Sequence, residues 1–174
     1  VKINAKPVIQ TLTADDSQVC SGSVIGLTAT TSDGGTGTAT WSTNVTSSTG
    51  LTATVSKTVT TQTKETVTLS YVSAKTCKAV DKTIDVTIDP IPSKPGVSDL
   101  SYCVNAIAAD LTATASSGCQ LQWYGTNAMG GTGSTVAPKP ITTTAGDTKY
   151  YVSQKNAGGC ESGRAVINVK VNSN

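Results

Sequence analysis

The chain has 174 residues, a formal net charge of +2 and no histidine, and charged residues make up 14% of it. Its lysines are scattered rather than clustered, which argues against binding to nucleic acid or to an anionic membrane surface. No apolar stretch reaches the roughly 18 residues of a transmembrane helix, so we expect no direct membrane insertion. The 31 threonines, many alternating with Val, Leu, Ile or Ala, are typical of a strand-rich protein.

Short segments recur along the chain in a constant order. Residues 1–7 (VKINAKP) resemble residues 86–89 (VTID) followed by residues 93–95 (SKP). Further matches are residues 27–30 with 111–114 (LTAT), Trp41 with Trp123, residues 71–73 with 151–153 (YVS), and residues 84–86 with 167–169. Because all the matches are displaced by nearly the same distance along the chain, we predict two domains, residues 5–90 and 91–174, with residues 1–4 as the tail of a preceding repeat.

Period-two alternation of apolar and polar residues marks segments 25–29, 67–71, 84–88 and 167–171 as half-buried strands. Clusters rich in Gly, Ser and Asp, such as residues 32–35 and 129–133, predict turns. Residues 89–96 contain three prolines and predict a short, extended linker. The fold class expected is therefore all-β: two tandem immunoglobulin-like β-sandwich domains, each of about seven short strands, joined by a Pro-rich linker.

The cysteines form two pairs of equal spacing. Cys20 and Cys77 are separated by the same length of chain as Cys103 and Cys160, which predicts one disulfide in each domain and an oxidising compartment. A metal site is the alternative, although it would normally use Cys-x-x-Cys spacing or histidines. Cys119 remains as a free thiol.

Each domain has one tryptophan, Trp41 or Trp123, at the place where an immunoglobulin-type sandwich buries its core tryptophan. Tyr124 follows Trp123 on the same predicted strand and should point outward, which makes it a candidate glycan contact. A structural role, in which Tyr124 covers a cross-strand neighbour, is the alternative.

Residues that commonly take part in catalysis or bind metal ions are scarce in this sequence. Without histidine, a serine or cysteine nucleophile lacks its usual base, and the acidic residues do not cluster in sequence, so we predict no enzyme activity and no cofactor. Asp15 and Asp16, or Asp89 and Asp99, are candidate calcium ligands. The simpler interpretation is that they are solvated loop acids, and we expect no metal site.

Residues 93–174 also resemble the immunoglobulin-like repeats of flavobacterial cell-surface adhesins. The resemblance rests on residues 102–103 (YC), 111–114 (LTAT), 123–124 (WY), 130–133 (GGTG), 150–154 (YYVSQ) and 159–162 (GCES). It implies an extracellular protein of the cell surface, exported by type IX secretion and used in gliding motility and attachment. The implied partners are neighbouring repeats of the same chain, with surface polysaccharide as a candidate.

Related repeats also occur in secreted glycan-degrading enzymes of the same bacteria. The resemblance therefore leaves a second interpretation open, in which these domains are carbohydrate-binding or spacer modules of such an enzyme. The first domain matches the repeats less well, because Ser42 follows its tryptophan and its Gly-Gly-Thr-Gly run, residues 34–37, precedes that tryptophan.

Overall fold

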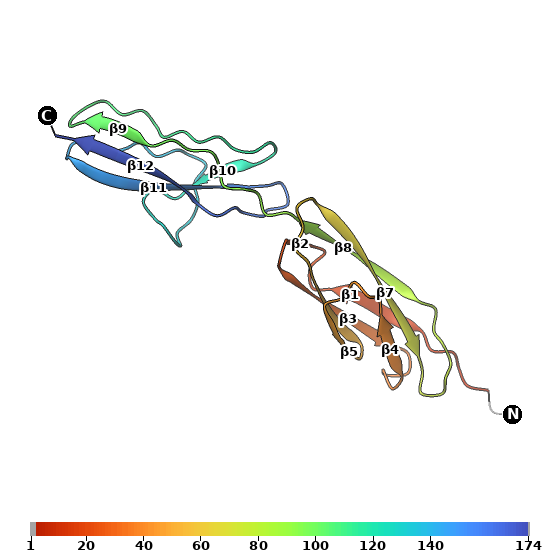
Figure 1. The fold of residues 1–174 in the computed structure, drawn as a ribbon. Coiled ribbons are helices and arrows are strands. Elements are labelled where there is room, and N and C mark those ends of the chain that lie inside the picture. The colour runs from red at the N-terminus through yellow and green to blue at the C-terminus, as the bar shows by residue number, and fades with distance from the viewer. Residues whose placement is uncertain (1–2, 174) are drawn as a thin grey trace. The chain divides into compact units, whose positions relative to one another are not determined.

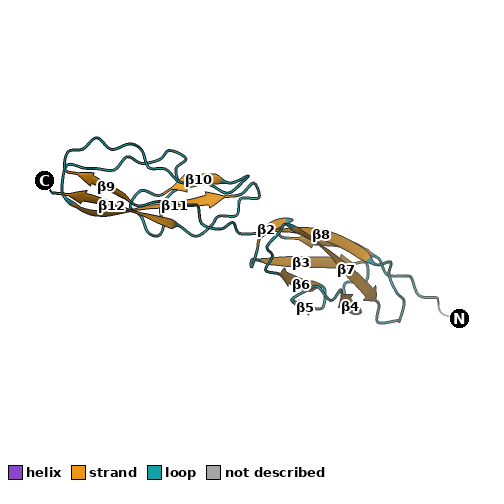
Figure 2. Cartoon of the chain, turned by 45° about the horizontal axis from the view of Figure 1, so that its top comes forward, coloured by secondary structure: helices purple, strands orange, loops and turns teal. Residues whose placement is uncertain are grey.

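The computed structural model describes residues 3–173, so half of the predicted tail, Val1 and Lys2, lies outside the described residues. The chain divides into two compact units, Val1–Pro90 and Ile91–Asn174, called here the first and the second domain. Every helix or strand found between residues 3 and 173 is a β-strand (Figure 2). That part of the chain accordingly holds no helix able to cross a membrane.

The first domain is a sandwich of two four-stranded sheets (Figure 1). One sheet has the order β1 (Ile9–Ala14), β3 (Val24–Thr31), β6 (Thr52–Ser56), β5 (Ser47–Thr49), and the other has the order β2 (Gln18–Cys20), β8 (Lys82–Asp89), β7 (Thr63–Val72), β4 (Thr38–Trp41). Alternate residues such as Ile25, Leu27, Val67 and Leu69 are at most 1% exposed and form one core. The alternation in segments 25–29, 67–71 and 84–88 is thereby confirmed as half-buried strand.

Between residues 91 and 173 the second domain has a single four-stranded sheet, with the order β10 (Gln120–Trp123), β11 (Gly146–Lys155), β12 (Ala165–Asn172), β9 (Leu100–Cys103). Its core gathers on one face of this sheet, around Trp123, Val152 and Ile167. The layer that closes this core lacks regular strands and is built from the segments at residues 104–119 and 124–145. The prediction of about seven strands is wrong for this domain.

Residues 111–114 show why the second layer lacks strands. The same LTAT sequence lies in β3 of the first domain, where it pairs with β1 and β6. In the second domain the Leu111 N–H donates to the carbonyl of Pro138, and Thr114 makes an isolated bridge to Gly96. Proline cannot donate to a ladder, and Pro95, Pro138 and Pro140 stand in the two flanking segments. Pairing therefore stops after one bond at Leu111 and one two-bond bridge at Thr114.

The two domains share one register at the hairpin that joins their last two strands. In the first domain the Ser73 N–H donates to the Cys77 carbonyl at 3.0 Å, and in the second the Asn156 N–H donates to the Cys160 carbonyl at 3.0 Å. Leu69 pairs with Lys82 in β7 and β8, as Val152 pairs with Ala165 in β11 and β12.

This common register corrects one of the sequence matches. The YVS segments, residues 71–73 and 151–153, are not structurally equivalent, because Tyr71 corresponds to Gln154. The sequence match of the two Tyr-Val-Ser segments is therefore out of register with the structural pairing of the strands.

The disulfides predicted within each domain are absent from this structure. Cys77, Cys103 and Cys119 have free thiols, whereas Cys20 and Cys160 are disulfide-bonded. Cys20 lies beside Asp89, the last residue of β8, while Cys77 precedes the first residue of that strand. Most of the length of β8, about 23 Å, therefore separates the ends on which the two cysteines lie, far more than the roughly 7 Å that a disulfide allows between Cα atoms.

The second domain repeats this arrangement. Cys103 lies beside Asn172 at the end of β12, and Cys160 lies in the turn before that strand begins. We call these opposite ends of each domain the C-terminal end and the hairpin end. The equal spacing of the cysteines thus marks equivalent positions in the two domains and does not mark bonded pairs.

Candidate functional site

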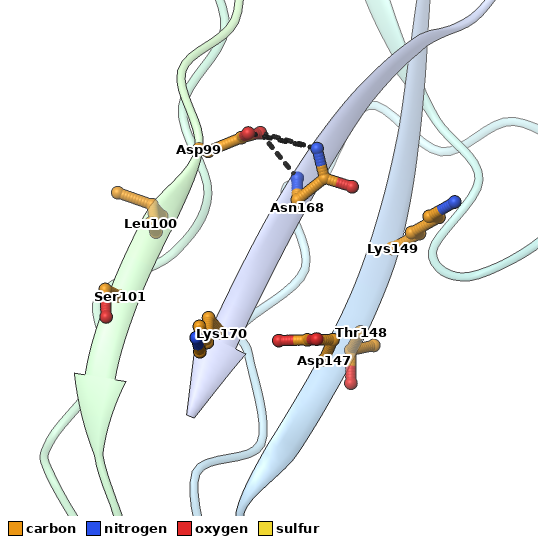
Figure 3. Close-up of a pocket in the computed structure, with 8 residues that line it drawn as sticks. All are labelled: Asp99, Leu100, Ser101, Asp147, Thr148, Lys149, Asn168 and Lys170. Atoms are coloured by element: carbon orange, nitrogen blue, oxygen red, sulfur yellow. Dashed lines mark hydrogen bonds between the residues drawn. The ribbon is translucent and has the colours of Figure 1, made fainter. Parts of the chain in front are cut away.

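A shallow polar groove of about 530 Å³ lies on the outer face of the second domain's sheet (Figure 3). The strands β9, β12 and β11, together with the residue before β9, supply its lining. The lining residues are Asp99, Leu100, Ser101, Asp147, Thr148, Lys149, Asn168 and Lys170.

The polar side chains of the groove are arranged in two rows across the strands. In one row, Lys170 on β12 lies opposite Ser101 on β9 and opposite Asp147 on β11. The row therefore places a lysine and an aspartate on facing positions of neighbouring strands, where opposite charges attract each other.

The second row is held by hydrogen bonds. Asn168 lies opposite Lys149, and its backbone N–H donates to Asp99 Oδ1 at 2.7 Å while its side-chain amide donates to both carboxylate oxygens at 3.0 Å. The backbone N–H and then the side-chain amide of Asn168 hold the pKa of Asp99 below its ordinary value. Asp99 is therefore a fixed carboxylate at neutral pH.

The chemistry of the groove is that of polar binding. A general acid or base needs a pKa shifted towards neutrality, and the pKa of Asp99 is shifted the other way. The lining residues include no aromatic ring on which a sugar could stack. What they offer is a set of hydrogen-bond donors and acceptors at a solvent-exposed surface, of which Asp99 and Asn168 hold each other in place.

Sequence reasoning identified only Asp99 of this set, and did so as a candidate calcium ligand. The signal that was available is the polar half of the alternation in segments 147–149 and 168–170, which places charged residues on one face of adjacent strands. Reading that face required the pairing of β11 with β12, which sequence periodicity does not specify.

The other three candidate calcium ligands are engaged by amide groups of the protein. Asp15 accepts from the Gly26 N–H, Asp16 accepts from the Gln18 N–H, and Asp89 accepts from the side-chain amides of Gln18 and Gln62. No group of three or more Asp, Glu, Cys or His side chains suited to a metal ion occurs among residues 3–173. The structure thus assembles no calcium cage from these residues.

Trp41 and Trp123 are buried, with 9% and 4% of their surfaces exposed. Tyr124, next to Trp123, lies on the opposite face of the sheet from that core, partly covered. The guanidinium of Arg164 lies over its ring at 3.4 Å from the centroid and donates to the carbonyls of Asn127 and Gly130. One face of the tyrosine ring is therefore occupied by a cation that also holds the 125–133 loop.

The phenol of Tyr124 is also engaged, because its hydroxyl donates to Glu161. Ser153 Oγ donates to the same carboxylate at 2.5 Å, and Lys155 Nζ lies 3.6 Å from its other oxygen. Burial raises the pKa of Glu161, but the two hydroxyl hydrogen bonds and the Lys155 charge outweigh burial and lower the pKa below its ordinary value. The cluster joins β10, β11 and the hairpin that leads to β12.

Residues 92–172 match the sequence family described as "Ig-like domain CHU_C associated". The match covers the second domain, including the groove and Tyr124, and the first domain lies outside it. Over these residues the second domain is similar in sequence to immunoglobulin-like modules. No curated protein is significantly similar to the chain.

Several solved structures are similar to the chain at low identity. Fibronectin(III)-like modules of Clostridium thermocellum CbhA are 12% identical, with 94% of this chain and 95% of that chain covered and a TM-score of 0.47. Titin domains I67–I69 are 14% identical, with coverages of 98% and 66% and a TM-score of 0.46.

The Bacteroides ovatus protein SGBP-B, solved in complex with a mixed-linkage heptasaccharide, is 13% identical with a TM-score of 0.37. This chain is aligned over 96% of its own length and spans 48% of that protein. At TM-scores below 0.5, none of these three similarities carries an argument.

Proposed function

We propose that the chain is a structural and adhesive repeat segment of a large bacterial cell-surface adhesin that acts in gliding motility and surface attachment. The observation that carries the proposal is the recurrence of one unit. The last two strands, their hairpin and the cysteine at each end recur in the same register in the two domains. The match of residues 92–172 to an immunoglobulin-like family supports a modular, non-enzymatic protein outside the cell.

The proposal is tested on cells of the source bacterium with Fab fragments raised against the purified chain. We expect the Fab to label intact cells and to reduce both attachment to glass and gliding speed. An in-frame deletion of the coding region for residues 5–174 should reproduce the loss of attachment. Intact cells that remain unlabelled, while permeabilised cells are labelled, would contradict a surface location.

A second function is favoured by the polar groove, which offers Asp147 and Lys170 in one row and Asp99 in the other. Such a surface is suited to hydrogen-bonding the hydroxyls of a polysaccharide, so this alternative makes the second domain a carbohydrate-binding or spacer module of a secreted glycan-degrading enzyme. Tyr124 could add stacking only if the Arg164 guanidinium moved off its ring.

Glycan arrays on the whole chain separate these two functions. The variants Lys170→Ala and Asp147→Ala remove the groove's charged row, and Tyr124→Ala removes the ring. The matched control is Lys64→Ala, because Lys64 is also an exposed lysine that lies beside an aspartate, Asp85, on the first domain's sheet. Glycan binding that is lost in a groove variant and kept in the control would favour the carbohydrate-binding function over the adhesin repeat.

A further inference from the structure

The outer faces of the last two strands carry different charges in the two domains. In the first domain Lys64 Nζ lies 2.8 Å from the Asp85 carboxylate, which also accepts from the Thr66 hydroxyl at 2.6 Å. In the common register, the positions that Lys64 and Thr66 occupy on β7 are taken by Asp147 and Lys149 on β11. The first domain thus pairs its charges on this face within one sheet.

The second domain leaves charges on this face without ion pairs. Among residues 3–173, the side chains that form ion pairs do not include Asp147, Lys149 or Lys170. All three residues are exposed, and all three line the polar groove (Figure 3). Two ammonium groups and one carboxylate can therefore interact with groups outside this chain.

The two rows of the groove are complementary to each other. Listed from β9 to β11, one row is Ser101, Lys170, Asp147 and the row beside it is Asp99, Asn168, Lys149. A second copy can pack face to face about a twofold axis that runs across the strands between these rows. Each strand then lies over the same strand of the other copy, and the two rows exchange places.

This exchange brings opposite charges together at two symmetric places. Asp147 of each copy faces Lys149 of the other, so both contacts join a carboxylate to an ammonium group. Lys170 faces Asn168 of the other copy, whose side-chain nitrogen donates to Asp99 and whose oxygen points away from Asp99 (Figure 3). That oxygen can accept a hydrogen bond from the ammonium group.

We propose that the outer face of the second domain's sheet binds the same face of a second copy of the chain, with the two sheets antiparallel. Sheets that pack face to face lie about 10 Å apart, a gap that a lysine and an aspartate can bridge together. Two rows on three strands form a small and polar patch, so the association is weak, reversible and sensitive to salt. The inference goes beyond the proposed function because it concerns contacts between chains.

The first test is sedimentation equilibrium of the whole chain over a range of concentrations. At about 0.01 M salt, where the Debye length is about 30 Å, the average mass should rise with concentration towards that of a dimer. In about 1 M salt, where the Debye length is about 3 Å, the chain should stay monomeric. A non-reducing gel checks that no dimer is covalent.

Two charge reversals test the predicted contacts without depending on a loss alone. Asp147→Lys places two lysines opposite each other, and Lys149→Asp places two aspartates opposite each other. Each variant alone should dimerise more than about tenfold more weakly than the parent chain. Mixed in equal amounts, the two variants should form a heterodimer, because each reversed charge then faces its opposite. A variant that failed to fold would not regain binding on mixing.

Lys139→Asp is the matched control, because Lys139 is an exposed lysine outside the four strands of this sheet. It should dimerise like the parent chain. Its mixture with fluorescently labelled Asp147→Lys has the same net charges as the rescuing mixture. That control mixture should bind the labelled chain more than about tenfold more weakly, because two lysines still face each other.

Two results would overturn the proposal. One is a parent chain that stays monomeric in low salt up to about 1 mM, and the other is a mixture of the two reversals that does not associate. A polysaccharide that binds the groove of a monomeric chain would also refute self-association, while it would support the carbohydrate-binding function. The labelling of intact cells by Fab fragments does not depend on either outcome.

Discussion

The two domains use one buried position for the same task with different chemistry. Tyr71 in the first domain and Gln154 in the second are equivalent, and both are completely buried. The Tyr71 hydroxyl accepts from the Gly37 N–H at 2.6 Å and donates to the Asp33 carboxylate. The Gln154 amide binds the Ser93 carbonyl and the Ser116 N–H and hydroxyl.

The choice of tyrosine or glutamine follows from the segments that each side chain must hold in place. In the first domain the second layer is a hydrogen-bonded sheet, and the tyrosine only fixes the 33–37 turn. In the second domain that layer has no ladder, and the glutamine fixes two irregular segments at once. A sandwich layer can therefore be secured by side-chain to backbone bonds when prolines prevent strand pairing.

The largest effect is expected from Gln154→Leu. The change removes the amide of a fully buried side chain and leaves the Ser93 carbonyl and the Ser116 N–H without these partly buried hydrogen bonds, which should lower the free energy of unfolding of the second domain by about 3 kcal/mol. Chemical denaturation followed by Trp123 fluorescence, in a Trp41→Phe background, measures it. The control Gln120→Leu changes an exposed glutamine of the same sheet and should stay within about 0.5 kcal/mol. An equal loss of stability in both variants would mean that the hydrogen bonds of the Gln154 amide contribute little.

The last glycine of each Gly-Gly-Thr-Gly run gives a matched pair. A Cβ at Gly37 would lie 2.1 Å from the Val72 carbonyl oxygen, whereas one at Gly133 would meet the side chains of Gln122 and Tyr124 at 2.9 to 3.1 Å. Backbone cannot move aside as side chains can, so Gly37→Ala should cost about 2 to 3 kcal/mol and Gly133→Ala less than about 1 kcal/mol. Thermal melts of the two variants test the order, and the reverse order would contradict this packing.

Tyr71→Phe should have a smaller effect than Gln154→Leu. The ring stays in the core and one hydroxyl is lost, which leaves the Gly37 N–H unpaired, so we expect a loss of about 1.5 kcal/mol from the first domain. Urea unfolding monitored at Trp41, in a Trp123→Phe background, reports it. Destabilisation as large as that of Gln154→Leu would show that the Tyr71 hydroxyl and the Gln154 amide contribute equally to the stability of their domains.

The smallest effect concerns acid sensitivity of the first domain. The Thr31 hydroxyl, followed by the Tyr71 hydroxyl and the Gly35 N–H, lowers the pKa of Asp33 below its ordinary value of 3.8, against the effect of burial. Because the folded pKa is lowered, this contribution to stability is complete above the ordinary value and is lost as the pH falls through the folded pKa.

NMR titration of the Asp33 carboxyl carbon should show a midpoint below 3.8 that rises in Tyr71→Phe. The carboxyl of Asp16, which accepts one backbone N–H in the same domain, serves as the reference resonance. An unchanged Asp33 midpoint in the variant would show that the Tyr71 hydroxyl does not contribute to the lowered pKa of Asp33.

The sequence predicted the strands whose alternation is strict and missed what depends on register. Segments 84–88 and 167–171 were recognisable because one face of each is buried. The LTAT segment at 111–114 has the same letters as β3, but its structure is decided by Pro138 in the facing segment. Local pattern specifies which face is buried, whereas the partner strand decides whether a strand forms at all.

The predicted pairing of the cysteines was wrong, and the groove was not predicted, for a related reason. Spacing along the chain established that Cys20 and Cys103 are equivalent but could not show that Cys77 lies at the other end of the domain. The groove needs β9, β12 and β11 side by side, and its charged residues, such as Lys170 and Asp147, come from strands that sequence alone does not pair.

One feature of both domains bears on how they would respond to tension. The last strand of each pairs in parallel with a short strand near the domain's beginning, β8 with β2 and β12 with β9. Pulling the two ends of such a domain drags these paired strands past each other along their own axes. Their hydrogen bonds are then loaded in shear and must yield together, whereas an antiparallel hairpin pulled from its open end unzips one bond at a time. Each domain thus has, at its C-terminal end, a pair of parallel strands whose hydrogen bonds resist tension in shear.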